Sequence, residues 1–394
     1  MRKLEWTLVA ALLAVCAGFP LVQAAYELAV DKESPQVLAL FTNKPTKENL
    51  HRWDDNAQDR SIFAKWLRPR VLQLRYDLFG EMAPKAVKGQ GDWLFYNQDV
   101  DYLLQPPYTD DRFYKGTFDT LLAGKRVNLR NPLIAITAFR DELRYRGIEL
   151  LLVPIPGKPS IYPEQIAKGF YGQPSSPSIK LIEDLRKRDF QVVDLFTPML
   201  EAKARGGAQL YLKRDTHWTP QGMEVAADVI AHSIKKMGLA ADSGAAMQSR
   251  YSLKDTTAER WGDIAEMTKV PNRKKIWITE KVQAKQVVDI LSGKPYQDET
   301  SSPILWLGDS FSRIYQTDAP TASGIISQVA YRLNQPLASI VNDGGASTVV
   351  RQQLSHKGEL LQGKKLVIWT FVERDLRFGS KGWQIEELPE PAGK

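Results

Sequence analysis

Nearly uninterrupted apolar runs, separated by segments with helical spacing, constrain the fold of this chain more than any other feature. A strand that is apolar at successive positions is expected to be buried on both faces, as the strands of parallel sheets are. Segments with amphipathic helical spacing lie between these runs. The alternation predicts an α/β fold in which a central, mostly parallel sheet is covered by helices on both faces. The apolar runs are 148–156 (IELLLVPIP), 191–196 (QVVDLF), 302–309 (SPILWLGD) and 364–372 (KKLVIWTFV), and the helical segments are 131–147, 176–190 and 219–238.

The last of these helical segments has recognisable ends. Thr219 is a suitable N-cap, Pro220 suits the first helical position, and Gly238 is a stop signal. Helical spacing also marks the polar segment 26–85, which has a further stop signal at Gly80. We therefore expect an N-terminal helical segment that packs on the main domain.

The domain organisation follows from these patterns. We expect a signal peptide or membrane anchor at 1–25, the helical segment at 26–85, the main domain at 86–380 and a tail at 381–394. We expect residues 387–394 (ELPEPAGK) of this tail to be frayed. The stretch 240–300 has weaker periodicity and more charge than its surroundings, and we interpret it as an insertion in the main domain.

The N-terminus has the pattern of an export signal. Arg2 and Lys3 precede an uncharged run from Trp6 to Ala25, and Val22 and Ala24 occupy the small-residue positions of a cleavage site. A run of this length could also span a bilayer uncleaved. We expect export in either case and favour cleavage after Ala24 over a retained anchor.

Cysteine and charge exclude several classes of protein. The single cysteine, Cys16, lies inside the apolar run, and Val15 before it argues against a lipoprotein signal. The rest of the chain therefore has no disulfide, thiol nucleophile or zinc–thiolate site, which suits a bacterial periplasm. The net charge of +7 is spread along the chain without a basic tail, so we expect no nucleic-acid partner. A mildly basic surface suits an acidic polysaccharide or an anionic membrane face.

Ser310 follows the third apolar run directly, in the motif GDSFS. In a parallel sheet, ligands gather beyond the carboxyl ends of the strands. A serine at a strand-to-helix turn there exposes its hydroxyl, and its backbone N–H can stabilise an oxyanion. Gly308 allows a tight approach, and Asp309 can cap or position the turn. This motif alone does not decide whether Ser310 is a nucleophile or whether Asp309 or Ser310 is only a helix cap.

A serine nucleophile needs a base, and the chain has few histidines. His51, His232 and His356 lie in contexts typical of surface positions. His217 differs, because it precedes a well-capped helix and follows Asp215 by two residues. An aspartate at this spacing can contact one ring nitrogen and orient the imidazole.

Asp215 and His217 could also be metal ligands or a polar helix entry. A catalytic metal usually needs a third protein ligand. No further histidine or acidic cluster is evidently partnered with this pair in the sequence. We therefore expect no metal and no cofactor.

The motifs GDSFS and DTHWT together resemble the SGNH hydrolase superfamily, and more narrowly the periplasmic acetyltransferases that O-acetylate alginate. The similarity extends over about residues 55–375 and includes DRSIFAKWLRPR, VKGQGDWLFY, RGIELLLVPIPGKPSIYPE, WGDI and VIWTFVERDL. Asp and His precede Ser, the reverse of ordinary SGNH esterases and characteristic of the alginate acetylation family. Because few residues follow the last predicted strand, we expect this chain to lack the C-terminal carbohydrate-binding module that some members carry.

The resemblance implies an SGNH hydrolase-like α/β/α sandwich with circularly reordered motifs and a catalytic triad of Asp215, His217 and Ser310. It also implies O-acetylation of a secreted polysaccharide through an acetyl-serine, with alginate first and cellulose second. Expected partners are a membrane-embedded protein that moves acetyl groups across the inner membrane and other exopolysaccharide export and modification proteins. The alternatives are a periplasmic carbohydrate acetylesterase and a non-catalytic polysaccharide-binding or scaffold protein.

Four further residues are candidates for substrate contact, each with an ordinary alternative. Trp218 could stack on a sugar ring or form part of the wall, and Lys158 could contact a uronate carboxylate or be a solvated loop lysine. Arg313, one turn after Ser310, could bind substrate or pair with an acid. Asn342 in VNDGGAS could complete the oxyanion hole, or the motif could be a glycine-rich turn.

Overall fold

The computed structural model describes residues 2–114, 121–122, 125–126, 131–168, 176–239, 248–379 and 382–390. The chain forms two compact units. We call Met1–Ala83 with Lys269–Arg273 the N-terminal unit, and Pro84–Thr268 with Lys274–Lys394 the main unit. Each is described by itself below.

The N-terminal unit is helical, as the sequence predicts. Thr46 caps α3 by accepting the Asn49 N–H at 3.2 Å, and Ser61 separates α3 from α4 and caps the latter. Gly80 ends α4 in the left-handed conformation (φ 67°), which confirms the predicted stop. The elements are α1 (Arg2–Tyr26), η1 (Glu27–Asp31), η2 (Gln36–Leu38), α2 (Ala39–Thr42), α3 (Lys47–Arg60) and α4 (Ile62–Phe79).

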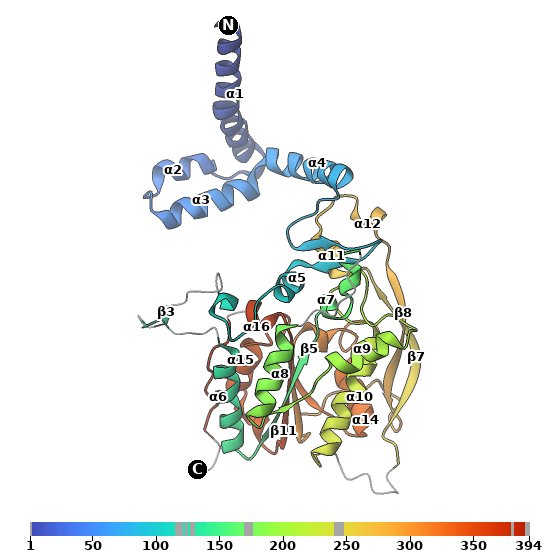
Figure 1. Cartoon of the computed structure of the whole chain (residues 1–394). Helices are drawn as coiled ribbons and strands as arrows, with labels where there is room; N and C mark the ends of the chain where they lie inside the picture. Colours follow the sequence, from blue (N-terminus) through green and yellow to red (C-terminus); the bar gives the residue numbers. More distant parts are fainter. Residues whose placement is uncertain are drawn as a thin grey trace. The chain divides into compact units, whose positions relative to one another are not determined.

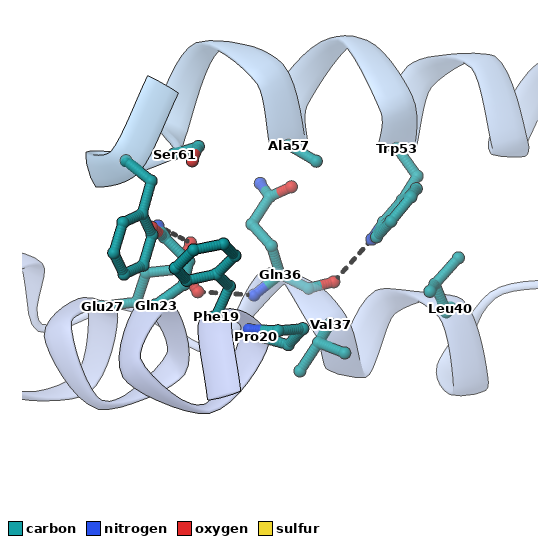
Figure 2. Close-up of a pocket in the computed structure, with 11 residues that line it drawn as sticks. Phe19, Pro20, Gln23, Glu27, Gln36, Val37, Leu40, Trp53, Ala57 and Ser61 are labelled. Atoms are coloured by element: carbon teal, nitrogen blue, oxygen red, sulfur yellow. Dashed lines mark hydrogen bonds between the residues drawn. The ribbon is translucent and has the colours of Figure 1, made fainter. Parts of the chain in front are cut away.

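Helix α1 is long and apolar enough to cross a membrane, and among the described residues only the stretch Trp6–Asp31 meets that test. Its C-terminal end is part of the folded N-terminal unit. Gln23 donates to the Arg60 carbonyl at 3.2 Å and accepts the Ile62 N–H at 2.9 Å. A pocket of about 350 Å³ lies beside it (Figure 2), lined by Phe19, Pro20, Gln23, Glu27, Gln36, Val37, Leu40, Trp53, Ala57, Ser61 and Phe63.

The main unit is built on a five-stranded sheet whose neighbouring strands are all parallel (Figure 1). The central strand β11 pairs with β9 on one side and β5 on the other, so that Leu366 lies opposite both Ile304 and Glu149. The predicted α/β class and mostly parallel sheet are confirmed. The strands, in spatial order, are β10 (Ala338–Val341), β9 (Ile304–Gly308), β11 (Leu366–Val372), β5 (Glu149–Ile155) and β6 (Gln191–Val192).

Successive residues of the central strands point into two separate cores, which explains the continuous apolar runs. Leu305, Leu307 and Trp369 join the core on one face, and Trp306 and Ile368 join the core on the other. The first core is covered by α6 (Pro132–Tyr145), α8 (Pro177–Lys187) and α15 (Val349–His356), and the second by α9 (Phe196–Ala204), α10 (Pro220–Lys236) and α14 (Ile325–Leu333). The expected three-layer sandwich is thus confirmed.

The stretch interpreted as a weakly periodic insertion contains the longest strands that the structure describes. β7 (Tyr251–Arg260) and β8 (Glu280–Asp289) form an antiparallel ribbon, and β8 contacts α10 and α14. The periodicity is weak because much of the ribbon is exposed on both faces, with few buried residues such as Ala258 and Val287. Between the strands lie α11 (Asp263–Met267) and α12 (Arg273–Ile276).

Part of the expected tail is packed rather than frayed. Trp383 and Leu388 are buried, and the Trp383 indole donates to the Asp375 carbonyl at 2.8 Å. The expectation of fraying is therefore wrong as far as Leu388, and residues 391–394 lie outside the described part. The remaining elements are β1 (Ala86–Lys88), β2 (Leu94–Tyr96), α5 (Asn97–Leu103), η3 (Asp111–Tyr114), β3 (Leu121–Leu122), β4 (Lys125–Arg126), α7 (Lys158–Ile161), η4 (Pro163–Gln165), α13 (Ser310–Arg313), η5 (Gly358–Leu361) and α16 (Asp375–Phe378).

Candidate active site

Ser310 lies at the carboxyl end of β9, as the sequence predicts, and begins α13. Asp309 caps the turn: its carboxylate accepts the N–H of Phe311 at 2.9 Å and that of Val372, at the end of β11, at 3.3 Å. Gly308 is required here because an added Cβ would lie 2.1 Å from the Ser312 hydroxyl. The turn therefore holds Ser310 at one place relative to two central strands.

Asp215 and His217 lie in a tight loop that leads into α10. The loop is closed by backbone hydrogen bonds from Leu212 N–H to the His217 carbonyl (3.1 Å) and from Thr219 N–H to the Leu210 carbonyl (2.9 Å). Thr219 caps α10 by accepting the Gly222 N–H at 3.2 Å, so the predicted N-cap is confirmed. The loop thus fixes the two side chains on a short, braced piece of backbone.

The two loops bring Asp215, His217 and Ser310 into one chain of hydrogen bonds. His217 Nδ1 lies 2.6 Å from Asp215 Oδ1, and His217 Nε2 lies 2.8 Å from Ser310 Oγ. The His217 N–H also donates to Asp215 Oδ1 at 3.1 Å. Asp215 is fully buried, His217 is 4% exposed and Ser310 is half-buried. Of these three side chains, only that of Ser310 is therefore accessible from outside the protein.

The electrostatics of the pair favour a charged histidine beside a charged aspartate. Burial by itself lowers the pKa of His217, but the charge and hydrogen bond of Asp215 raise it more, and the net pKa lies above its ordinary value. Burial by itself raises the pKa of Asp215, but His217 and the Arg260 guanidinium outweigh this effect and hold the pKa below its usual range. The site is therefore prepared to stabilise an imidazolium.

A fourth residue of the site, Asp263 at the start of α11, was missed by the sequence reasoning. Its carboxylate accepts the N–H and the hydroxyl of Thr216, both at 2.7 Å, and lies 3.9 Å from His217 Nδ1. Gly262 before it has φ 100°, and an added Cβ would lie 2.3 Å from the Arg214 carbonyl. Burial, and then the charge of Asp215, raise the pKa of Asp263. The motif RWGDIAEM contained the signal, but spacing alone could not place it beside His217.

Asp263 also overturns one argument made from the sequence. Ligand atoms of Asp215, His217 and Asp263 lie within 4.8 Å of one another, so a third possible metal ligand is present. The three groups are already engaged: Asp263 accepts two hydrogen bonds from Thr216, and Asp215 accepts two from His217. This pattern is that of a hydrogen-bonded relay, and the absence of a metal stays a prediction.

A ladder of ion pairs runs from the buried Asp215 to the surface. Arg260 lies 3.5 Å from Asp215 Oδ2 and 2.9 Å from Asp318, and Arg313 pairs with Asp318 and, at 2.7 Å, with Asp343. Of the two alternatives for Arg313, pairing with an acid is the one observed. Its side chain is only one third exposed, and both of its contacts are carboxylates.

Lys158 is neither a substrate contact nor a solvated lysine. It is fully buried at the start of α7, and its ammonium donates to the carbonyls of Leu212 (3.1 Å), Lys213 (3.0 Å) and Asp215 (2.7 Å). Burial lowers the pKa of Lys158 to about 8. Both sequence alternatives are wrong, because the side chain turns inward to hold the loop that carries Asp215 and His217.

Trp218 forms part of the core. Its indole has no exposed surface and packs edge-on against Phe311 with ring centroids 5.2 Å apart. Stacking on a sugar ring is therefore wrong, because no face of the ring is accessible.

Asn342 lies next to the Ser310 turn through its backbone. Its N–H donates to the Gly308 carbonyl at 3.0 Å, and its side-chain oxygen is turned toward Gly345. Gly344 has φ 65°, so the motif does form a glycine-rich turn. The role of Asn342 in an oxyanion hole stays a prediction. The remaining histidines, His51, His232 and His356, are exposed, as expected.

One protein family, described as the SGNH hydrolase-like domain of the acetyltransferase AlgX, matches residues 86–373. The chain belongs to this family. The match begins at β1 and ends directly after β11, so it takes in the whole parallel sheet and both loops of the site.

Two similar proteins are named for alginate acetylation or biosynthesis. The probable alginate O-acetylase AlgJ of Azotobacter vinelandii is 31% identical over 175 residues, which are 43% of this chain and 39% of that protein. The alginate biosynthesis protein AlgX of Pseudomonas aeruginosa is 30% identical over 156 residues, 38% of this chain and 28% of that protein. The chain thus matches well under half of the length of these relatives.

A solved structure supports the fold. The O-acetyltransferase domain of Pseudomonas putida AlgJ superposes with a TM-score of 0.56 at 23% identity, covering 74% of this chain and 92% of that domain. Identity at this level shows the shared architecture alone.

Proposed function

We propose that this protein is an O-acetyltransferase that acetylates hydroxyl groups of a secreted polysaccharide. The observation that carries the proposal is the Asp215–His217–Ser310 chain of hydrogen bonds at the carboxyl end of β9, in a member of a family described as acetyltransferases. A serine with a histidine base and an orienting aspartate is the constellation that acyl transfer requires.

In the first half-reaction, Ser310 Oγ attacks the carbonyl carbon of an acetyl donor while His217 Nε2 takes the hydroxyl proton. Asp215 keeps its charge, holds the ring through Nδ1 and stabilises the imidazolium. When the tetrahedral intermediate collapses, the bond to the leaving group breaks and His217 returns the proton to that group. The product is acetyl-Ser310.

In the second half-reaction, a sugar hydroxyl attacks the acetyl-serine. His217 takes the proton of that hydroxyl and gives it to Ser310 Oγ as the acetyl group leaves. Water in place of the sugar would make the protein an esterase, so exclusion of water by the bound acceptor decides the outcome.

The developing oxyanion needs hydrogen-bond donors. The backbone N–H of Ser310, at the start of α13, is the first of these. The Asn342 side-chain amide, carried on the turn that binds Gly308, is the second, and it would have to turn away from Gly345 to act.

Alginate is the acceptor that we propose. The relatives that match this chain are named for alginate O-acetylation and alginate biosynthesis, and the net charge of +7 suits a polyuronate. A membrane-embedded protein that delivers acetyl groups and other export and modification proteins are the proposed partners. Cellulose is the second acceptor that we propose.

We further propose that the protein works in the periplasm and keeps α1 as a membrane anchor. Cleavage after Ala24 would remove Phe19 and Gln23 from the N-terminal unit. The two backbone groups that Gln23 binds, the Arg60 carbonyl and the Ile62 N–H, would lose their partner. This contact favours retention over the cleavage that the sequence alone suggested.

Incubation of the protein with an acetyl donor and oligomannuronate tests the proposed activity. A mass gain of one acetyl group on the oligosaccharide, absent with the Ser310→Ala variant, is the expected result. Release of acetate without modification of the oligosaccharide would favour the esterase. If the Ser310→Ala variant released acetate as fast as the wild type, both the transferase and the esterase proposals would be wrong.

A further inference from the structure

One face of α4 carries large apolar side chains at the surface. Leu67, Val71, Leu74 and Leu78 are three or four residues apart, which brings them to one side of the helix. Their exposed fractions are 49%, 42%, 57% and 64%. We call these four residues the α4 stripe, and a surface of this kind marks a contact with a partner or with lipid.

The opposite side of α4 is the one that packs within the N-terminal unit. Gln73 accepts the backbone N–H of Asn272 at 3.2 Å and donates to Asp77 at 2.8 Å. Leu72 and Tyr76, on the same side, are half-buried. The N-terminal unit therefore uses one side of the helix and leaves the α4 stripe outward.

The start of α4 is fixed to the end of the apolar helix α1. The rings of Phe19 and Phe63 lie 4.2 Å apart, and Gln23 binds the backbone on both sides of the α3–α4 junction. About 20 helical residues cross the hydrocarbon core of a bilayer. A span of 20 residues that begins at Trp6 therefore ends at Ala25, two residues after Gln23, at the depth where α4 starts.

Within the N-terminal unit, α4 runs across the direction of α1 (Figure 1). If α1 crosses a membrane, α4 then extends along the membrane surface. Its side chains suit that position: Arg68, Arg70 and Arg75 are exposed beside the stripe, and the Arg70 guanidinium lies 4.2 Å over the exposed Trp66 ring. Tryptophan and arginine are favoured at the level of anionic lipid head groups.

We propose that α4 lies in the membrane–water interface, with the α4 stripe in the acyl boundary of an anionic bilayer and the arginines at the head groups. The inference rests on the proposed retention of α1 as an anchor. It adds a second membrane contact, which would orient the N-terminal unit on the periplasmic surface instead of leaving it on a single helix.

The test uses the full chain in vesicles of phosphatidylethanolamine and phosphatidylglycerol. In a Cys16→Ala background, a fluorophore that responds to polarity is attached at Leu74→Cys, on the stripe, or at Lys65→Cys, on the far side of α4. Lipids with a quencher at a shallow acyl position are then added to the vesicles. We expect blue-shifted emission and several-fold stronger quenching at position 74 than at position 65.

Weak, equal quenching at the two positions would overturn the proposal, because the stripe would then face water. Blue-shifted emission at position 74 without lipid quenching would also overturn it, because protein would then cover the stripe. Intact mass of the same preparation reports whether α1 is retained, and acetyl-ester hydrolysis reports the activity of Ser310. Failure of the interfacial helix is thus distinguished from failure of the anchor or of the proposed activity.

Discussion

The difference in burial between Ser310 and its two partners decides what the residues of this site can do. Asp215 and His217 are shielded from solvent, so their attraction is weakened little by water or salt. Ser310 is half-buried and can meet a substrate. The arrangement keeps the Asp215–His217 pair inside and leaves the Ser310 side chain partly open to solvent.

Replacing Asp215 by Asn should lower kcat for hydrolysis of an acetyl ester by roughly 10³–10⁴-fold, because an amide can hold the ring in the wrong tautomer. Replacing Ser310 by Ala should cost at least as much. Steady-state kinetics with a chromogenic acetyl ester measure both losses. Circular dichroism should show an unchanged fold, and activity near that of the wild type in either variant would contradict the assigned roles.

Replacing Asp263 by Asn should shift the pH dependence of the reaction. His217 acts as a base only when neutral, so activity should rise with pH through its pKa, which lies above the ordinary value. The negative charge of Asp263 is one cause of that raised pKa, so its removal should move the midpoint to lower pH.

The pH profile of kcat/KM checks this shift. Asp343→Asn, at the far end of the ion-pair ladder, is the matched control and should keep the midpoint of the wild type. An Asp263→Asn midpoint equal to that of the control would mean that Asp263 carries no charge next to His217.

Contacts between single residues could be predicted where a motif contained them, but not where burial alone decides. Scarcity of histidine and the two motifs selected Asp215, His217 and Ser310, and the structure places their side chains in hydrogen-bond contact, while their catalytic roles stay a proposal. Lys158 and Trp218 were misjudged because a lysine after a strand and a tryptophan beside a base look the same in sequence whether they face solvent or core. Their orientation depends on neighbours from distant segments, such as Phe311 against Trp218.

At the scale of elements, the site depends on a braced loop and a capped turn. Two helices hold the loop that carries His217. The Lys158 ammonium of α7 donates to three carbonyls of the loop, and the Asp263 carboxylate of α11 accepts two hydrogen bonds from Thr216. The turn that carries Ser310 is held between β9 and β11 by Asp309. These braces therefore set the distance between His217 and Ser310.

Replacing Lys158 by Met should lower the free energy of unfolding by several kcal/mol. The carbonyls of Leu212, Lys213 and Asp215 would lose this donor, and that of Lys213 would keep the Leu94 N–H at 2.9 Å. Each buried acceptor left unpaired costs about 1–3 kcal/mol. Urea unfolding measures the loss, and acetyl-ester hydrolysis should fall as the loop shifts. Lys213→Met, which removes only an exposed pair with Asp92, should change stability by less than about 1 kcal/mol. Equal stability of the two variants would contradict the bracing role.

The helices and strands of the sandwich were predictable because each buries a regular apolar pattern. The β7–β8 ribbon was not, because many of its side chains are exposed on both faces and its sequence therefore lacks strict alternation. Helix α11 lies between the two strands of this ribbon, so the position of Asp263 could not be predicted either.

At the scale of the whole molecule, the chain has two units. The N-terminal unit is helical and includes the apolar stretch Trp6–Asp31, and the α/β main unit contains the candidate site. The class of the main unit followed from the sequence. The extent of the N-terminal unit did not, because the polar contacts of Gln23 with the α3–α4 junction join residues far apart in the chain.

Retention of α1 should be visible in the mature protein. Intact mass of the protein extracted from membranes is expected to include residues before Ala25, and high-salt washing should not release it. A mass that corresponds to a chain starting at Ala25, with the protein in the soluble periplasmic fraction, would contradict the anchor.

The most direct test of the central claim is detection of the acetyl-serine. Protein quenched shortly after mixing with an acetyl donor should carry one acetyl group, mapped to the peptide that contains Ser310. When oligomannuronate is added before quenching, the acetyl group should be transferred from Ser310 to the oligosaccharide. Acetylation at another residue, or acetylated oligosaccharide formed at an unchanged rate by the Ser310→Ala variant, would contradict the account.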